Sequence, residues 1–145
     1  QIASFIVDVS SGPNASNYHH WVIRENDGLG ALGIIGFDVV RFKTSQQQKT
    51  SRGIHWNLGY WIAPEKRGRG IATISIDVMI DVAKRCEVDV VELMANPCND
   101  GGVRTILSAV ERHGGFPSEV ERWMVDDDGS DILYVSHWIL TGDGR

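Results

Sequence analysis

The sequence predicts an α+β domain, three-layer α/β/α in character, built on a mixed and mostly antiparallel central sheet. Ile54 to Ile62 alternates apolar and polar residues, which is the period of a strand. Ile71 to Cys86 repeats its apolar residues at helical spacing, and it leads into Val88 to Ala95, a nearly continuous apolar run typical of a strand buried on both faces. This order favours a right-handed β-α-β unit at the centre of the domain.

The length and composition restrict the class of protein. The 145 residues fit one domain, 1–145, with a short or truncated N-terminal part over about residues 1–17. The net charge of -5 gives no general reason to bind nucleic acid, and no apolar run approaches the roughly 18 residues of a membrane-spanning helix. Cys86 and Cys98 are expected to be free thiols, which favours a cytoplasmic protein. No cluster of histidine and cysteine has zinc-site spacing, so we expect no metal.

Three strands are expected before the central one: Ile2 to Val9, His19 to Arg24 and Leu32 to Phe42. The dipeptide Asp27-Gly28 marks a hairpin turn between the last two of these strands. Gly33 and Gly36 in the return strand indicate a bulge or a close backbone approach. The polar segment Lys43 to Arg52 lacks periodicity, so we expect a loop there that is either simply solvated or able to gate a cleft.

A helix and a closing hairpin are expected after the central unit. Ile106, Leu107 and Val110 would form the inner face of the helix, and Gly114-Gly115 would end it. The expected elements are a capping loop at Asn96 to Gly102, a helix at Val103 to His113, strands at Val120 to Val125 and Ile132 to Leu140, and a turn at Asp126 to Gly129.

The stretch from Trp61 to Ala72 carries the strongest functional signal. An apolar run ends at Pro64, a basic turn with two glycines follows, and the long helix starts at about Ile71. A glycine turn that opens a helix presents free backbone N–H groups and the positive end of the helix dipole. The sequence therefore predicts a phosphate-binding site at this turn.

This turn also carries a resemblance to a known family. Arg67-Gly68-Arg69-Gly70-Ile71-Ala72 resembles the Arg/Gln-x-x-Gly-x-Gly/Ala signature of GNAT-type N-acetyltransferases. The similarity in element order covers roughly Trp21 to Leu140, including Val90 to Met94 and the helix that closes on His113 to Phe116. A dinucleotide-binding fold is the rival interpretation, but Thr73 stands where its third glycine should be and repeated β-α units are missing. The resemblance thus implies the acyl-CoA N-acyltransferase fold.

An acetyl-CoA-dependent N-acyltransferase is the activity that the resemblance implies. It would transfer an acetyl group to a primary amine of a small molecule or protein by direct attack, and the alternative is a catalytically weak acyl-CoA-binding domain. In the family, the turn and helix start bind the pyrophosphate of coenzyme A, and the preceding strand pairs with the pantetheine arm. Carried over, the coenzyme-binding residues are Trp61, Ile62, Ala63, Lys66, Arg67, Gly68, Arg69, Gly70, Ile71, Ala72 and Asn99.

Two side chains are candidates for the general base. Glu92 interrupts a buried strand, so its carboxylate should be paired or have a raised pKa that suits a base. The alternative for Glu92 is a salt bridge to Arg104 or Arg112, or a place at a strand end that reaches solvent. His55 stands on the more polar face of the central strand, where either a base or a packing role fits it. Asn57 shares that face and could orient a substrate.

The sequence departs from the family pattern at two points. The tyrosine that usually protonates the leaving thiolate is missing from Val103 to His113, which leaves Ser108 as a candidate to hold a water near the sulfur. Too few residues separate Val9 from His19 for the two helices that the family usually places there. An acceptor side left open in this way would favour a homodimer that completes its wall.

Overall fold

The structure is a computed structural model that describes residues 5–9, 18–26, 28, 30–40 and 53–142. The start of the first expected strand, Asp27 of the hairpin turn, the loop that follows Val9 and the polar loop Lys43 to Arg52 lie outside the described residues. The elements are β1 (Phe5–Val9), β2 (Tyr18–Glu25), β3 (Ala31–Val39), β4 (His55–Ile62), the 3-10 helix η1 (Pro64–Lys66), α2 (Ile71–Arg85), β5 (Val90–Ala95), α3 (Asp100–His113), β6 (Phe116–Pro117), β7 (Arg122–Val125) and β8 (Asp131–Leu140).

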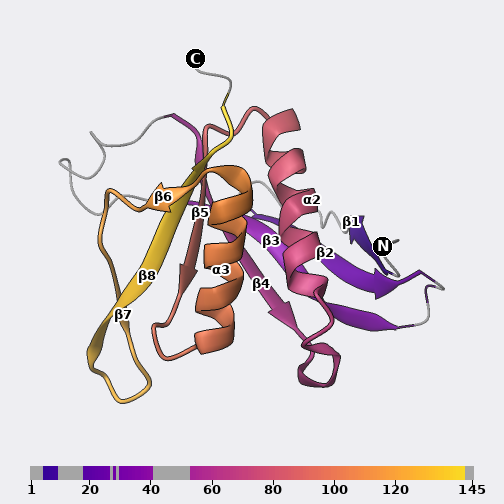
Figure 1. Ribbon diagram of the computed structural model, residues 1–145, viewed down its shortest axis with the longest axis horizontal. Helices are drawn as coiled ribbons and strands as arrows, with labels where there is room; N and C mark the ends of the chain where they lie inside the picture. Colours follow the sequence, from indigo (N-terminus) through magenta and orange to yellow (C-terminus); the bar gives the residue numbers. More distant parts are fainter. Residues whose placement is uncertain (1–4, 10–17, 27, 29, 41–52, 143–145) are drawn as a thin grey trace.

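The strands form one sheet in the order β1-β2-β3-β4-β5-β8-β6, and β7 pairs with β8 beyond that path. Only β4 and β5 run parallel among the pairs of described strands, and α2 connects them, which confirms the expected β-α-β unit and the mixed α+β class. Figure 1 shows α2 and α3 side by side over one face of the sheet. The third layer of the expected α/β/α arrangement is not among the described residues.

The ladder between β4 and β5 is short. It joins only His55 to Val90, Trp56 to Val91 and Asn57 to Glu92, although both strands continue past this point. On their outer sides, β4 remains paired with β3 as far as Ile62, and β5 remains paired with β8 as far as Ala95. The two strands therefore separate after Asn57 and Glu92, and we call this separation the β4–β5 fork.

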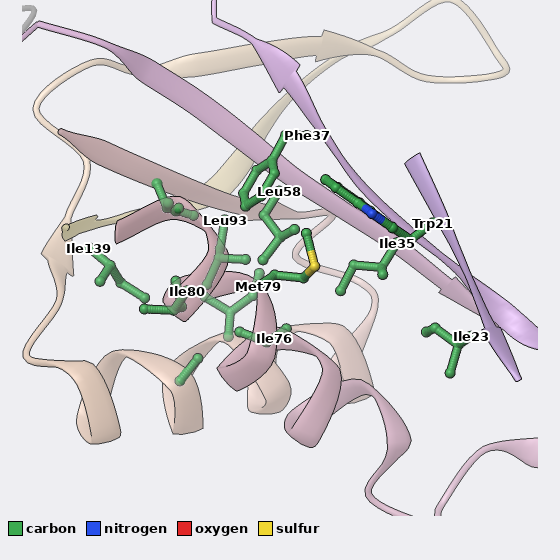
Figure 2. Close-up of a cluster of buried hydrophobic side chains, with 14 of the residues drawn as sticks. Trp21, Ile23, Ile35, Phe37, Leu58, Ile76, Met79, Ile80, Leu93 and Ile139 are labelled. Carbon is green, nitrogen blue, oxygen red and sulfur yellow. The ribbon is translucent and has the colours of Figure 1, made fainter. Parts of the chain in front are cut away.

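The core lies between the sheet and the two helices, as Figure 2 shows. Ile76, Met79 and Ile80 of α2 are at most 1% exposed there, in agreement with the apolar stripe predicted for that helix. The prediction for the inner face of α3 was partly wrong, because Leu107 is 47% exposed while Ala109 is fully buried. The helix turns Ile106 and Ala109 towards the core, a spacing of three residues that keeps both on one face.

The ends of α3 follow from local chemistry. The helix begins at Asp100, three residues earlier than Val103, and the side chain of Asn99 caps it by accepting a hydrogen bond from the Gly102 N–H at 3.0 Å. Gly114 ends it in the left-handed region, with a φ of 70°, as predicted. The β7–β8 hairpin with its turn after Val125 is also confirmed, whereas the short strand β6 was not predicted.

Gly33 permits the close approach of β3 to β4 that the sequence predicted. A Cβ on Gly33 would lie 2.2 Å from the Trp61 carbonyl oxygen, and the β2–β3 register shifts beside it, between Ile23 and Arg24. We expect Gly33→Ala to reduce the free energy of unfolding by about 1–3 kcal/mol, because two backbones must move apart. Gly59→Ala on β4 is the matched control, since its Cβ would meet nothing within 4 Å. Urea denaturation of both variants measures the difference, and equal stabilities would contradict this account.

Candidate functional site

The first turn of α2 offers a set of backbone donors. Gly70 is the N-cap residue with a φ of 75°, and no side chain caps the helix. The first intrahelical bond runs from the Ile74 N–H to the Gly70 carbonyl at 3.1 Å, and no described residue accepts from the N–H groups of Ile71, Ala72 or Thr73. A Cβ at Gly68 or Gly70 would meet nothing within 4 Å. The turn therefore has both the free donors and the open space that a phosphate group needs.

The cations of the turn are partly engaged. The Arg67 side chain donates from Nε to the Ile62 carbonyl at 3.0 Å, which ties the turn to the end of β4. Arg69 lies 3.5 Å from the Glu25 carboxylate in an exposed ion pair, so its charge is partly balanced. Lys66 is half-buried at the end of η1. The donors of the helix, rather than these three charges, are the best-prepared part of the anion site.

The backbone groups of β4 alternate between its two neighbours. The Ala63 N–H donates to the Leu32 carbonyl at 2.8 Å, and the His55 carbonyl accepts from the Val40 N–H at 3.0 Å, so the odd-numbered positions face the β3 side. The Ile54 carbonyl accepts from the N–H groups of Asp89 and Val90, so the even-numbered positions face the β5 side. We call this assignment of odd-numbered positions to the β3 side and even-numbered positions to the β5 side the parity of β4. It holds along the whole strand, because the backbone groups of successive residues point to opposite sides.

Beyond the fork, the parity places the backbone groups of Leu58, Tyr60 and Ile62 on the side from which β5 has separated. The expected strand edge at Trp61, Ile62 and Ala63 is therefore corrected: Trp61 and Ala63 direct their backbone groups to the β3 side. Of the three expected residues, only Ile62 contributes to the open edge, and its carbonyl accepts from Arg67. Within the described part of the chain, the backbone groups of Tyr60 and the Ile62 N–H have no strand partner on this side, and they end beside the free donors of α2.

Tyr60 is a residue of this edge that sequence reasoning missed. Its side chain packs against the core, and its hydroxyl interacts with the side chain of Thr105 on α3. Burial raises the pKa of Tyr60, and the hydrogen bond with Thr105 lowers it in part, so the phenol is protonated at neutral pH. The Thr105 hydroxyl donates to the Gly101 carbonyl, so it accepts from the Tyr60 hydroxyl, and Tyr60 offers its backbone groups to the edge. The alternation of β4 already placed Tyr60 on the same face as Leu58 and Ile62, which was the available signal.

Two expected site residues have structural partners instead. The Asn99 side chain caps α3, as described above, so its amide oxygen is occupied. The Ser108 hydroxyl accepts a hydrogen bond from Arg112, which in turn donates to the Asp77 carboxylate of α2. His113 also bonds Asp77 at 2.6 Å. These contacts link α2 to α3. Ser108 therefore has a structural role at the contact between the two helices.

Glu92 is the centre of a buried polar network. Its side chain is inaccessible to solvent, and five groups bond its two oxygens at 2.6–3.1 Å: His55 Nε2, Arg122 Nε, Arg122 Nη2, the Ser136 hydroxyl and Trp138 Nε1. A carboxylate has about four lone-pair positions, so this one is saturated. The alternative of a salt bridge is the one supported, but the partner is Arg122 rather than Arg104 or Arg112.

The protonation state of Glu92 follows from these contacts. Burial alone would raise its pKa, but the hydrogen bonds from His55, Arg122 and Ser136 and the charge of Arg122 outweigh it and lower the pKa to about 2. A carboxylate with so low a pKa and no free lone pair is a poor acceptor for a substrate proton. The geometry therefore argues against Glu92 as the general base and gives it a structural role.

His55 is drawn into the same network. It is 4% exposed, its Nε2 lies 2.8 Å from a Glu92 oxygen, and its ring meets the Trp138 ring edge-on at 4.7 Å between centroids. It stands at the start of β4, on the closed side of the fork. Since its ring is enclosed by these partners, the packing role considered for His55 is favoured over that of a base.

The described residues give two further findings. No three side chains of His, Cys, Asp or Glu come together among them in a way that could hold a metal ion. Their helices include none that is long and apolar enough to cross a membrane.

Comparisons with known proteins agree with this geometry. Residues 1–109 match the family described as Acetyltransferase (GNAT) domain. Similar solved structures include yncA from Salmonella typhimurium with its cofactor acetyl-CoA, with a TM-score of 0.65, 17% identity, and coverage of 88% of this chain and 67% of that one. Spermidine N-acetyltransferase from Vibrio cholerae with CoA and spermine gives a TM-score of 0.64, 16% identity, and coverage of 88% and 68%.

A third similar structure is the ribosomal-protein-S5-alanine acetyltransferase from Vibrio fischeri, with a TM-score of 0.63, 16% identity, and coverage of 88% of this chain and 64% of that one. At these identities the likeness to solved structures shows the fold. No curated protein matched the sequence.

Proposed function

Because the chain belongs to the GNAT acetyltransferase family, we propose that it is an acetyl-CoA-dependent N-acetyltransferase that acts on a primary amine. The observation that carries this proposal is the continuity of two features. The edge of β4 at Tyr60 and the Ile62 N–H, which lack a strand partner among the described residues, leads directly to the uncapped first turn of α2. An extended chain with amide groups at one end and phosphates at the other matches this path, and coenzyme A has that chemistry.

Each part of the path has a separate task in this proposal. The N–H groups of Ile71, Ala72 and Thr73 bind the pyrophosphate, and the edge at Tyr60 and Ile62 binds the pantetheine amides. A backbone N–H near the fork donates to the thioester oxygen as negative charge develops on it. Acetyl-CoA supplies the activated acetyl group and a thiol leaving group, whose pKa of about 8.5 makes its departure undemanding.

The acceptor is proposed to be an amine of a small molecule or of a protein. The solved relatives support this class, because one holds spermine with CoA and another is described as acetylating the alanine of a ribosomal protein. A specific observation favours a second candidate function, a catalytically weak acyl-CoA-binding domain. The helix α3 carries no tyrosine, and Val110 stands nearest the position where the family resemblance places one.

Titration with acetyl-CoA tests the coenzyme site. We expect the melting temperature to rise with ligand, because a ligand at 100 times its dissociation constant adds about 2.7 kcal/mol to the stability of the folded state. Sodium acetate at the same concentrations is the control and should leave the melting temperature unchanged. If millimolar acetyl-CoA gives no shift, both the enzyme and the binding domain are excluded. Release of free thiol in the presence of a panel of amines then separates an enzyme, which releases it, from a binder, which does not.

A further inference from the structure

As far as the described residues go, a second substrate can reach the fork from one face of the sheet, the face opposite the two helices. On the face covered by α2 and α3, the residues around the fork are fully packed: Leu58 is 2% exposed, and Leu93 and Ile106 are inaccessible. An acceptor amine that attacks a group held at the β4 edge must therefore approach from the opposite face. The odd-numbered positions of β4, which include Asn57, Gly59 and Trp61, direct their side chains to that face.

A row of polar residues crosses this open face at the fork. The strand registers pair Asp38 of β3 with Asn57 of β4, and Asn57 with Glu92 of β5, so the three share one face. Glu92 is buried and saturated, whereas the Asp38 side chain is 46% exposed, with His20 Nε2 at 3.8 Å. Among the described residues of this row, Asp38 is thus the carboxylate that a ligand can reach.

Asn57 adds an unsatisfied acceptor to the row. Its Oδ1 is buried and has no hydrogen-bond partner among the described residues. A buried acceptor without a partner costs free energy, and an N–H group brought to this position would recover it. Asn57 belongs to the last pair before the strands separate, so this acceptor lies at the fork itself.

The neighbouring positions on the same face are apolar. Gly59 has no side chain, and the space where a Cβ would lie is open to at least 4 Å. Beyond it, Ile34 and Trp61 are a cross-strand pair, and they are 48% and 51% exposed. An aromatic ring and an aliphatic side chain that are half-exposed side by side suit the apolar part of a ligand, and the ring also suits a cation.

We propose that this surface, composed of Asp38, Asn57, Gly59, Ile34 and Trp61, binds the acceptor as an organic ammonium. The ammonium group pairs with Asp38 and donates to Asn57, and its apolar substituent lies over Gly59 against Trp61. Before attack the ammonium gives one proton to solvent water beside the half-exposed Asp38 side chain, which leaves a neutral amine with a free lone pair. The second proton, released as the amide forms, goes to the departing thiolate. The acceptor is therefore an alkyl or arylalkyl primary amine with no carboxylate beside its nitrogen, because a carboxylate there would be repelled by Asp38. This inference rests on the proposed function and specifies the acceptor class for it.

Phenethylamine and phenylalanine test this selectivity, because they share the apolar group and the amine and differ by one carboxylate. With acetyl-CoA present, we expect wild-type protein to acetylate phenethylamine with a higher kcat/KM than phenylalanine. In Asp38→Asn, kcat/KM for phenethylamine should fall about tenfold, mainly through KM, since a half-exposed charge-assisted contact is lost. In the same variant, the ratio of kcat/KM for phenethylamine to kcat/KM for phenylalanine should decrease.

Asp81→Asn is the matched control, because Asp81 is exposed on α2, an element that lies on the other face. It should leave both values of kcat/KM unchanged. Calorimetric binding of phenethylamine to the full chain provides a second readout that requires no turnover, and circular dichroism checks that each variant is folded. An unchanged KM and an unchanged binding constant in Asp38→Asn, or a wild-type preference for phenylalanine, overturns the assignment. Failure of acetyl-CoA to bind wild-type protein instead overturns the proposed function.

Discussion

Arg122→Met is expected to reduce the free energy of unfolding by about 3–5 kcal/mol, because it leaves the Glu92 carboxylate buried without its compensating charge. Arg122 supplies two of the five hydrogen bonds to Glu92, and the Glu92 side chain is inaccessible to solvent. Methionine keeps most of the length and apolar stem of arginine, so the loss reports on the charge and the hydrogen bonds rather than on packing. Urea denaturation at neutral pH measures it.

The pH dependence identifies the cause of this loss. The pKa of Glu92 is lowered to about 2 from an ordinary value of 4.5, so its interactions stabilise the fold above that ordinary value and lose this contribution as pH falls towards 2. The difference between wild type and Arg122→Met should therefore shrink as the solution becomes acidic. Arg104→Met on the exposed surface of α3 is the control and should cost less than about 0.5 kcal/mol. If Arg122→Met reduced the free energy of unfolding equally at pH 7 and at pH 3, the reduction would come from lost packing rather than from the charge of Glu92.

The Glu92 network also shows where sequence reasoning reaches its limit. An acidic residue inside an apolar strand indicated a buried, paired carboxylate. The partner could not be identified, because Arg122 lies 30 residues further along on a strand that reaches Glu92 only through the pairing of β7 with β8 and of β8 with β5. Local periodicity does not encode such contacts, and Arg104 and Arg112 on α3 are not the residues that reach the Glu92 carboxylate.

The helices and turns were predictable because their causes are local. The period of α2 is contained in its own 15 residues, and the left-handed Gly114 ends α3 wherever the helix packs. The inner face of α3 was harder, since it depends on how the helix is rotated against the sheet, and Ala109 replaces Leu107 there. The open edge of β4 depends on which neighbouring strand its odd-numbered positions face. The amino-acid types along β4 do not indicate this, because it concerns the backbone groups.

The phosphate site is the part of the proposed function that a variant can test most directly. Arg67→Glu combined with Gly70→Asp is expected to weaken acetyl-CoA binding by at least about 100-fold. The first change places a negative charge at the turn and removes the Arg67 contact with the Ile62 carbonyl. The second places a carboxylate at the N-cap of α2, where it accepts from the N–H groups that the phosphates would use. Aspartate is among the non-glycine residues that tolerate the left-handed conformation, so the fold should survive.

The matched control is Arg85→Glu combined with Gly129→Asp. It has the same change of charge and again replaces a left-handed glycine with open space around it, since the φ of Gly129 is 84° and nothing lies within 4 Å of its Cβ position. Because Arg85 is at the far end of α2 and Gly129 is in the β7–β8 turn, this control should bind acetyl-CoA as wild type does. Calorimetric titration of the three proteins separates two causes. A loss in the first variant alone assigns binding to the turn and the helix start, whereas equal losses in both variants would assign it to net charge.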